Sequence, residues 1–143
     1  MIKDIISIAA EAGFNLVPLI NGTALNAKLD EYVNTMRDGM FIMLPEAKEK
    51  RQRTYDHASI TTIEIVATSH TLFTDDDVQD FDNVNDAVER LEKNIEEVVM
   101  ALQDSGMFED VTRIRYRIYP YRYDSFQTVV SAMFDLTKSE VPC

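Results

Sequence analysis

The chain has 143 residues, of which 45% are apolar and 27% are charged, and its 25 acidic and 14 basic side chains give a formal charge of −11. At this length one hydrophobic core is the default, so we expect a single domain over residues 1–143. The single cysteine, Cys143, excludes an intrachain disulfide and a cysteine zinc cluster, and the acidic balance disfavours general affinity for nucleic acid.

A short helix is expected at the N-terminus, because apolar residues recur at helical spacing over residues 2–10 and stop at Gly13. Residues 15–38 leave two structures open. The dipeptide Asn21-Gly22 is a strong hairpin signal, whereas the apolar residues that follow it also fit a helical stripe. An extra hairpin or an extra helix therefore follows the first helix.

Two strands are expected next. The β-favouring apolar run at residues 39–44 ends at Pro45, which cannot continue a ladder. Apolar and polar side chains then alternate over residues 59–70, as in a half-buried strand. Between the strands we expect a flexible loop at residues 46–58. This loop carries one of two basic clusters, namely Lys48, Lys50, Arg51 and Arg53.

The clearest element is a long helix in the acidic part of the chain. Residues 73–110 carry 13 acidic and 2 basic side chains, so that the rest of the chain is neutral overall. Within this segment apolar residues recur in steps of three and four up to Leu102 and stop before Gly106, opposite a solvated acidic face. We expect the helix to start near Asn83 or Asn85, after an acidic linker.

Two more strands close the chain. In the first, an apolar set alternates with a basic set: Ile114, Tyr116 and Ile118, and Arg113, Arg115 and Arg117. In the second, alternation runs over residues 126–136, and residues 138–143 form a short tail. The order α-β-β-α-β-β predicts an α+β two-layer domain, with helices packed on one face of a mainly antiparallel four-stranded sheet. The other face, where Val66, Val129 and Met133 would be partly exposed, is expected to be an interface.

The sequence offers no catalytic constellation. His57 and His70 flank one strand and lie too far apart along it to share a site within a subunit. The four glycines form neither a phosphate-binding loop nor a nucleophile elbow. A calcium-loop frame on Asp75 and Asp77 fails, because Asp80 stands where that loop requires glycine. We expect no enzyme activity, no metal and no cofactor.

Three functions are open for the arginine row, defined as Arg113, Arg115 and Arg117. The row can pair with Glu64 or Asp135 across strands, which would be purely structural. It can dock on the acidic face of a neighbouring subunit, where complementary charge sets the partner and the register. It can contact single-stranded nucleic acid, although the nearby acidic segment opposes this. The predicted interface comprises the row, the basic loop residues, and Asp75, Asp76 and Asp77.

In the order of its elements the chain resembles the tail-terminator, or tail-completion, proteins of tailed bacteriophages and similar neck and ring proteins. The resemblance is carried by MIKDIISIAAEAGFN, GMFIMLPE, SITTIEIVATSH with its acidic linker, NDAVERLEKNIEEVVMALQ and RIRYRIYPYRYDSFQTVVSAMFDLT. It covers most of the chain and contains no invariant motif. The segment between Gly13 and Gly39 departs from the long-tailed type, so that a ring in a short-tailed particle is equally open.

The resemblance implies a virion structural protein that acts as a homo-oligomeric ring. Such a ring joins the portal or connector of the capsid to tail components, through head-to-tail contacts between complementary patches. DNA would pass through the channel without specific binding, and no membrane would be involved. The protein would be made in the host cytoplasm and located in the neck or tail. Alone, the chain would be monomeric or weakly associated.

The alternative is a small cytoplasmic regulatory or binding module that holds a peptide or small ligand on the exposed sheet face. It predicts one apolar pocket in a stable monomer. An enzyme ranks third, because no spacing in the sequence predicts a cluster of perturbed carboxylates.

Overall fold

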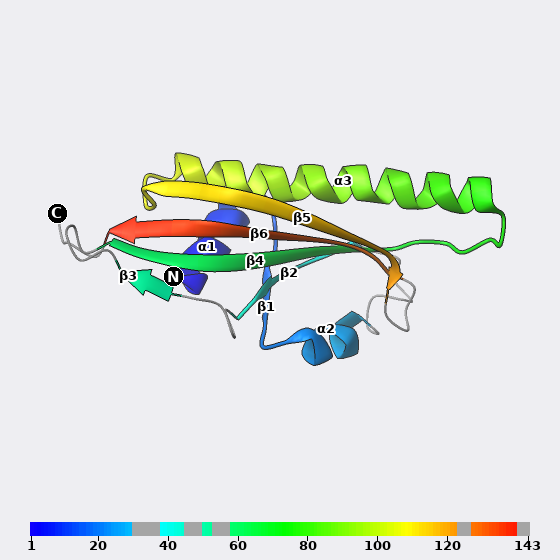
Figure 1. The fold of residues 1–143 in the computed structure, drawn as a ribbon, viewed down its shortest axis with the longest axis horizontal. Helices are drawn as coiled ribbons and strands as arrows, with labels where there is room; N and C mark the ends of the chain where they lie inside the picture. The colour runs from blue at the N-terminus through cyan, green and yellow to red at the C-terminus, as the bar shows by residue number, and fades with distance from the viewer. Residues whose placement is uncertain (30–37, 45–49, 53–57, 123–126, 140–143) are drawn as a thin grey trace.

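A computed structural model describes residues 1–29, 38–44, 50–52, 58–122 and 127–139. In chain order the elements are α1 (Ile2–Glu11), β1 (Val17–Leu19), α2 (Gly22–Leu29), β2 (Gly39–Met43), β3 (Lys50–Gln52), β4 (Ala58–His70), α3 (Asp77–Asp104), β5 (Asp110–Arg122) and β6 (Gln127–Ser139). The fold is α+β, as expected, and it is elongated along α3 and the three long strands (Figure 1).

The sheet is larger than expected and mixed. Its strands follow the order β1-β2-β4-β6-β5, and β3 also pairs with β4. The pairs β2–β4, β3–β4, β4–β6 and β5–β6 are antiparallel, whereas β1 pairs with β2 in parallel. The four expected strands are present as β2, β4, β5 and β6 and pair antiparallel, as predicted. The sequence missed β1 and β3, because strands of three residues are too short to show a period of two.

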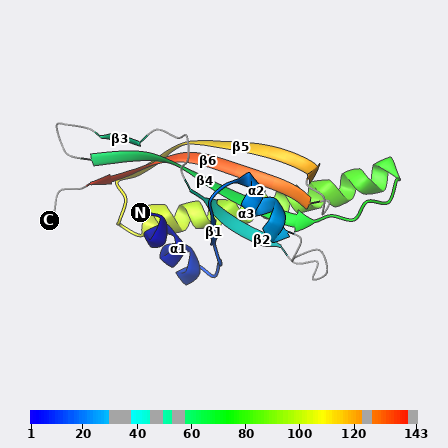
Figure 2. The same ribbon diagram turned by 90° about the horizontal axis from the view of Figure 1, so that it is seen from below.

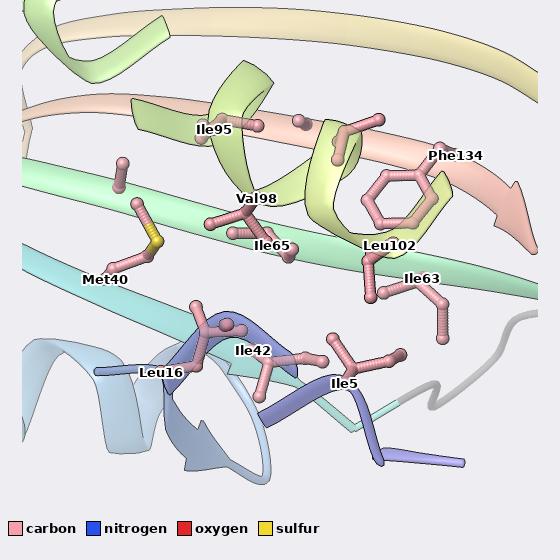
Figure 3. Close-up of a cluster of buried hydrophobic side chains, with 14 of the residues drawn as sticks. Ile5, Leu16, Met40, Ile42, Ile63, Ile65, Ile95, Val98, Leu102 and Phe134 are labelled. Atoms are coloured by element: carbon pink, nitrogen blue, oxygen red, sulfur yellow. The ribbon is translucent and has the colours of Figure 1, made fainter. Parts of the chain in front are cut away.

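The main core lies between the sheet and the two helices α1 and α3, which cover one face of it (Figure 2). Figure 3 shows side chains from both helices and from three strands gathered in this cluster, among them Ile5, Ile65, Ile95, Leu102 and Phe134. All five are fully buried, with 0% of their surface exposed. The alternation predicted for β6 is confirmed here, since Val130, Ala132, Phe134 and Leu136 all enter this core.

The third helix, α2, covers part of the opposite face, so the expectation that all helices share one face was wrong. Leu25 and Leu29 of α2 pack with Phe41, Val66 and Val129 in a second buried cluster. The last two residues were expected to be partly exposed and are instead buried. A helix on each face leaves less of the sheet open than the sequence suggested.

Residues 15–38 begin with a short strand and continue as a helix rather than forming a hairpin. Asn21 Oδ1 accepts a hydrogen bond from the Ala24 N–H at 3.0 Å, as a helix-capping side chain does. Asn21 and Gly22 therefore start α2, and β1 pairs with β2 instead of folding back. Residues 30–37 lie outside the described residues.

The long helix α3 has 28 residues and is about 42 Å long at 1.5 Å per residue. It begins at Asp77, before the expected Asn83, because Asp76 caps it by accepting the N–H groups of Val78 and Gln79. Its end near Gly106, where φ is +74°, agrees with the sequence. In the described part of the chain, no helix is long and apolar enough to cross a membrane.

Parts of the predicted loop and tail lie outside the described residues. The backbone of β3 falls inside the predicted loop of residues 46–58, and β6 continues through Ser139. Lys48, Arg53, His57 and residues 140–143 lie outside the described residues. The structure places Lys50 and Arg51 in β3 by their backbone alone.

Candidate assembly surfaces

Strand β5 forms a long open edge of the sheet. It has 13 residues and pairs with β6 on one side, and none of the described residues pairs with its other side. At the opposite margin, β1 and β3 have only three residues each. A long strand edge presents unpaired N–H and C=O groups that can take another chain. Both views show β5 at the margin of the sheet (Figures 1 and 2).

The two sides of β5 differ in chemistry. Arg115 and Arg117 lie opposite Met133 and Ser131, on the sheet face away from α3. Tyr116 and Ile118, which lie opposite Ala132 and Val130, face the α3 side, as the alternation predicted. Yet Ile114, Tyr116 and Ile118 remain 38%, 36% and 47% exposed, because α3 does not fully cover the outermost strand.

Tyr116 lies near the acidic side of α3. Its partial burial, followed by the charges of Glu96 and Glu92, raises the pKa of the phenol above its ordinary value. The phenol therefore stays neutral at physiological pH. An uncharged aromatic ring, partly covered and partly open, is a typical interface residue.

A bulge breaks the arginine row at Arg113. Thr112 pairs with Asp135 and Arg115 with Met133, so two residues of β5 share one place opposite β6. Arg113 has φ +57°, in the left-handed region that costs a residue other than glycine about 1–2 kcal/mol. The expected row of three alternating arginines is therefore wrong in detail, since only Arg115 and Arg117 keep the strand period.

The register does not support cross-strand ion pairs for the arginine row. Met133 lies between Glu64 and Arg115, and Asp135 is opposite Thr112 rather than an arginine. Glu64 and Asp135 accept hydrogen bonds from Ser131 at 2.7 Å and from Thr62 at 2.8 Å. Within the described ranges, no ion pair joins the row to a carboxylate. The structural interpretation of the row thus loses its geometric basis.

A second exposed surface lies at the beginning of α3. We call it the α3 tip and define it as Asp75, Asp76, Asp77, Val78, Phe81 and Asp82. The helix projects here beyond the ends of β5 and β6 in both views (Figures 1 and 2). Val78 is 73% exposed and Phe81 is 68% exposed, among carboxylates. Two such apolar side chains in water mark a contact surface more readily than a solvated helix end.

Polar contacts hold the α3 tip in shape. The backbone N–H and the hydroxyl of Thr74 both donate to Asp80 Oδ1 at 2.7 Å. Asn83 Nδ2 donates to the carbonyl of Leu72 at 3.2 Å, which ties the approaching segment to the second turn of the helix. Together with the cap at Asp76, these bonds make the tip a preorganised structure.

One side chain fixes α3 on the sheet. Arg90 donates to both carboxylate oxygens of Asp38 at 2.8 and 3.1 Å, and to the hydroxyl of Ser69 at 2.7 Å. The hydrogen bond to Asp38 is the main reason that the pKa of Arg90 is raised above its ordinary value. The bridge joins α3 to β4 and to the start of β2, and it therefore orients the tip.

Cavities in the described residues offer little for catalysis. A cavity of about 460 Å³ between α1 and the end of α3 is lined partly by Asp4, Glu11 and Asp104. Another, of about 210 Å³, lies beside α2 and is lined partly by Glu64 and Tyr119. Within the part of the chain that the structure describes, no three histidine, cysteine or carboxylate side chains are grouped to hold a metal ion.

No protein-family model and no curated protein matches this chain. Its function is therefore inferred from its own surfaces. These define an α+β domain with an open basic strand edge and a projecting acidic tip.

Proposed function

We propose that the protein is a structural subunit that assembles into an oligomeric ring. One observation carries this proposal: two exposed surfaces of opposite charge, each with apolar side chains, lie at different places on the same chain. A contact between identical subunits that closes into a ring needs two different and complementary patches on each subunit. A subunit surface that contacts only solvent would require neither of these two patches.

The ring we propose belongs to the neck or tail of a tailed bacteriophage virion. Support comes from the resemblance in element order, namely an N-terminal helix, a long acidic helix and a closing pair of long strands. Its other partners would be portal, connector or tail proteins. The net charge of −11 suits a channel through which DNA passes without specific binding. The proposal includes no catalysis, metal, cofactor or membrane.

The alternative, a regulatory or binding module that uses the sheet face, has weaker support. Helix α2 covers part of that face, and the cavity beside it has a volume of about 210 Å³. Pockets for drug-sized ligands usually measure about 300–1,000 Å³. A small ligand would therefore find little enclosed space there.

Measurement of mass in solution over a concentration series, followed by negative-stain imaging, tests the proposal. Because the chain alone is expected to associate only weakly, its mass should equal the 16.4 kDa of one chain in dilute solution and rise with concentration to a fixed limit at which rings are visible. A monomer at every concentration that the protein will reach contradicts self-assembly.

Charge reversal provides the matched comparison. The variant Arg113→Glu/Arg115→Glu should fail to assemble, because both charges lie on the open edge. Lys3→Glu/Lys93→Glu changes the net charge equally at exposed positions elsewhere and should assemble normally. Equal loss in both variants would ascribe the effect to net charge alone.

A further inference from the structure

We infer that the α3 tip of one subunit packs on the β5 edge of the next copy of this chain. The β5 edge is defined as Arg113, Ile114, Arg115, Tyr116, Arg117 and Ile118. This inference rests on the proposed ring function, and it names the two surfaces that form the contact between subunits.

Charge selects this pairing over the symmetric ones. Two β5 edges paired with each other would bring their arginine rows together, and like charges on facing strands destabilise a sheet. Two α3 tips would bring together the carboxylates of Asp75, Asp77 and Asp82. Only the combination of one tip with one edge places opposite charges in contact.

Apolar surface is present on both sides of the contact. Val78 and Phe81 are three residues apart, so they lie on one face of the helix and point the same way. On the edge, Ile114, Tyr116 and Ile118 are exposed to a third or more of their surface. A phenylalanine that enters such a patch is a typical anchor of an interface, and the arginines border the same open edge from the other face of β5.

The shape of the subunit favours a contact with another copy. The tip extends past the ends of β5 and β6, as both ribbon views show (Figures 1 and 2), so it does not lie on the β5 edge of its own chain. The bonds from Thr74 to Asp80 hold the tip in shape before it binds, so that association costs little conformational entropy. The contact is heterologous and therefore repeats around a ring.

A mixing experiment tests the contact directly. Phe81→Lys should inactivate the α3 tip, and Arg115→Glu/Arg117→Glu should inactivate the β5 edge. Each variant alone should stay monomeric at concentrations at which the wild type assembles. An equal mixture should form a dimer of twice the 16.4 kDa chain mass and nothing larger. Only one intact tip and one intact edge are present, and the resulting dimer ends in two inactive surfaces.

Met100→Lys is the matched control for Phe81→Lys, because Met100 is also an exposed apolar residue of α3 but lies away from the tip. This variant should assemble as the wild type does. All altered positions are exposed, and circular dichroism with thermal unfolding checks that each variant folds.

The outcomes separate this inference from the proposed function. A wild type that stays monomeric overturns both. A wild type that assembles, with a tip variant that assembles equally well, leaves the ring intact and overturns the tip-to-edge contact. A mixture that stays monomeric, or that grows beyond a dimer, also overturns this contact.

Discussion

Arg113 holds a strained backbone position on the surface that we assign to assembly. With φ +57°, it occupies a bulge position that glycine would adopt more easily. Arg113→Gly should therefore raise the free energy of unfolding by about 0.5–1 kcal/mol and at the same time weaken assembly, because the edge loses a charge. Urea denaturation at protein concentrations too low for assembly gives the free energy of unfolding. Mass measurements at higher protein concentrations give the strength of assembly.

Arg115→Gly is the control for this prediction. It lies two residues away in the same strand and keeps the regular register with Met133. Glycine there should lower the stability by about 0.5–1 kcal/mol, since a strand interior loses conformational restriction and packing. A similar loss in both variants would show that the backbone at Arg113 is not strained.

Thr68 carries a buried hydroxyl without a hydrogen-bond partner. The side chain is fully buried in β4, and an unpaired buried polar group costs about 1–3 kcal/mol. Thr68→Val has nearly the same shape and should raise the free energy of unfolding by about 1 kcal/mol. Thr71→Val should lower it by a similar amount, because the Thr71 hydroxyl bonds to Thr128 Oγ1 at 2.7 Å. If both variants lower the free energy of unfolding equally, the Thr68 hydroxyl is hydrogen-bonded to a buried water molecule.

Among the elements, those with a long apolar period were predictable. The end of α3 near Gly106 and the alternation of β6 follow directly from side-chain spacing. The start of α3 was not predictable from this spacing. Its first turns are held by Asp76 and Asp80, which accept backbone N–H groups, rather than by apolar contacts. Short elements such as β1 depend on a distant partner strand that the local sequence does not reveal.

The capping bond of Asp76 gives a prediction for the element that forms the tip. Asp76→Ala should speed amide hydrogen exchange in the first two turns of α3 about fivefold, which corresponds to about 1 kcal/mol. Global unfolding should change less, because these turns project beyond the sheet. Asp76→Asn keeps a capping oxygen and should retain the protection. Unchanged exchange in Asp76→Ala would show that the Thr74–Asp80 bonds alone hold the tip.

For the whole molecule, the sequence predicted the kind of surface but not its composition. The arginine row and Asp75 to Asp77 are recognisable as complementary charges from the sequence alone. Phe81 is not recognisable in this way, because the helix expected from the sequence begins after it, so that Phe81 is assigned to no helix face. The open edge of β5 follows from strand order, which depends on pairing across the whole chain.

Ionic strength provides the test at the scale of the whole molecule. Two effects compete, since salt screens the attraction between tip and edge and also the repulsion between subunits of charge −11. Because the Debye length is about 10 Å at 0.1 M salt, most carboxylates along the roughly 42 Å of α3 are already screened from the neighbouring subunit. The charges in contact should dominate. Sedimentation equilibrium should therefore show association about tenfold weaker at 0.5 M than at 0.1 M salt, as expected for a few rim pairs of about 0.2–1 kcal/mol each.

The edge variant Arg115→Glu/Arg117→Glu isolates the repulsive term, because it retains the acidic tip and lacks the charges that attract it. Any residual association of this variant should strengthen with salt, opposite in sign to the wild type. If the wild type also associates more strongly at high salt, then repulsion between subunits outweighs the contact charges. The ring would in that case depend on apolar contacts such as those of Phe81, and the arginines would act mainly to prevent two β5 edges from pairing.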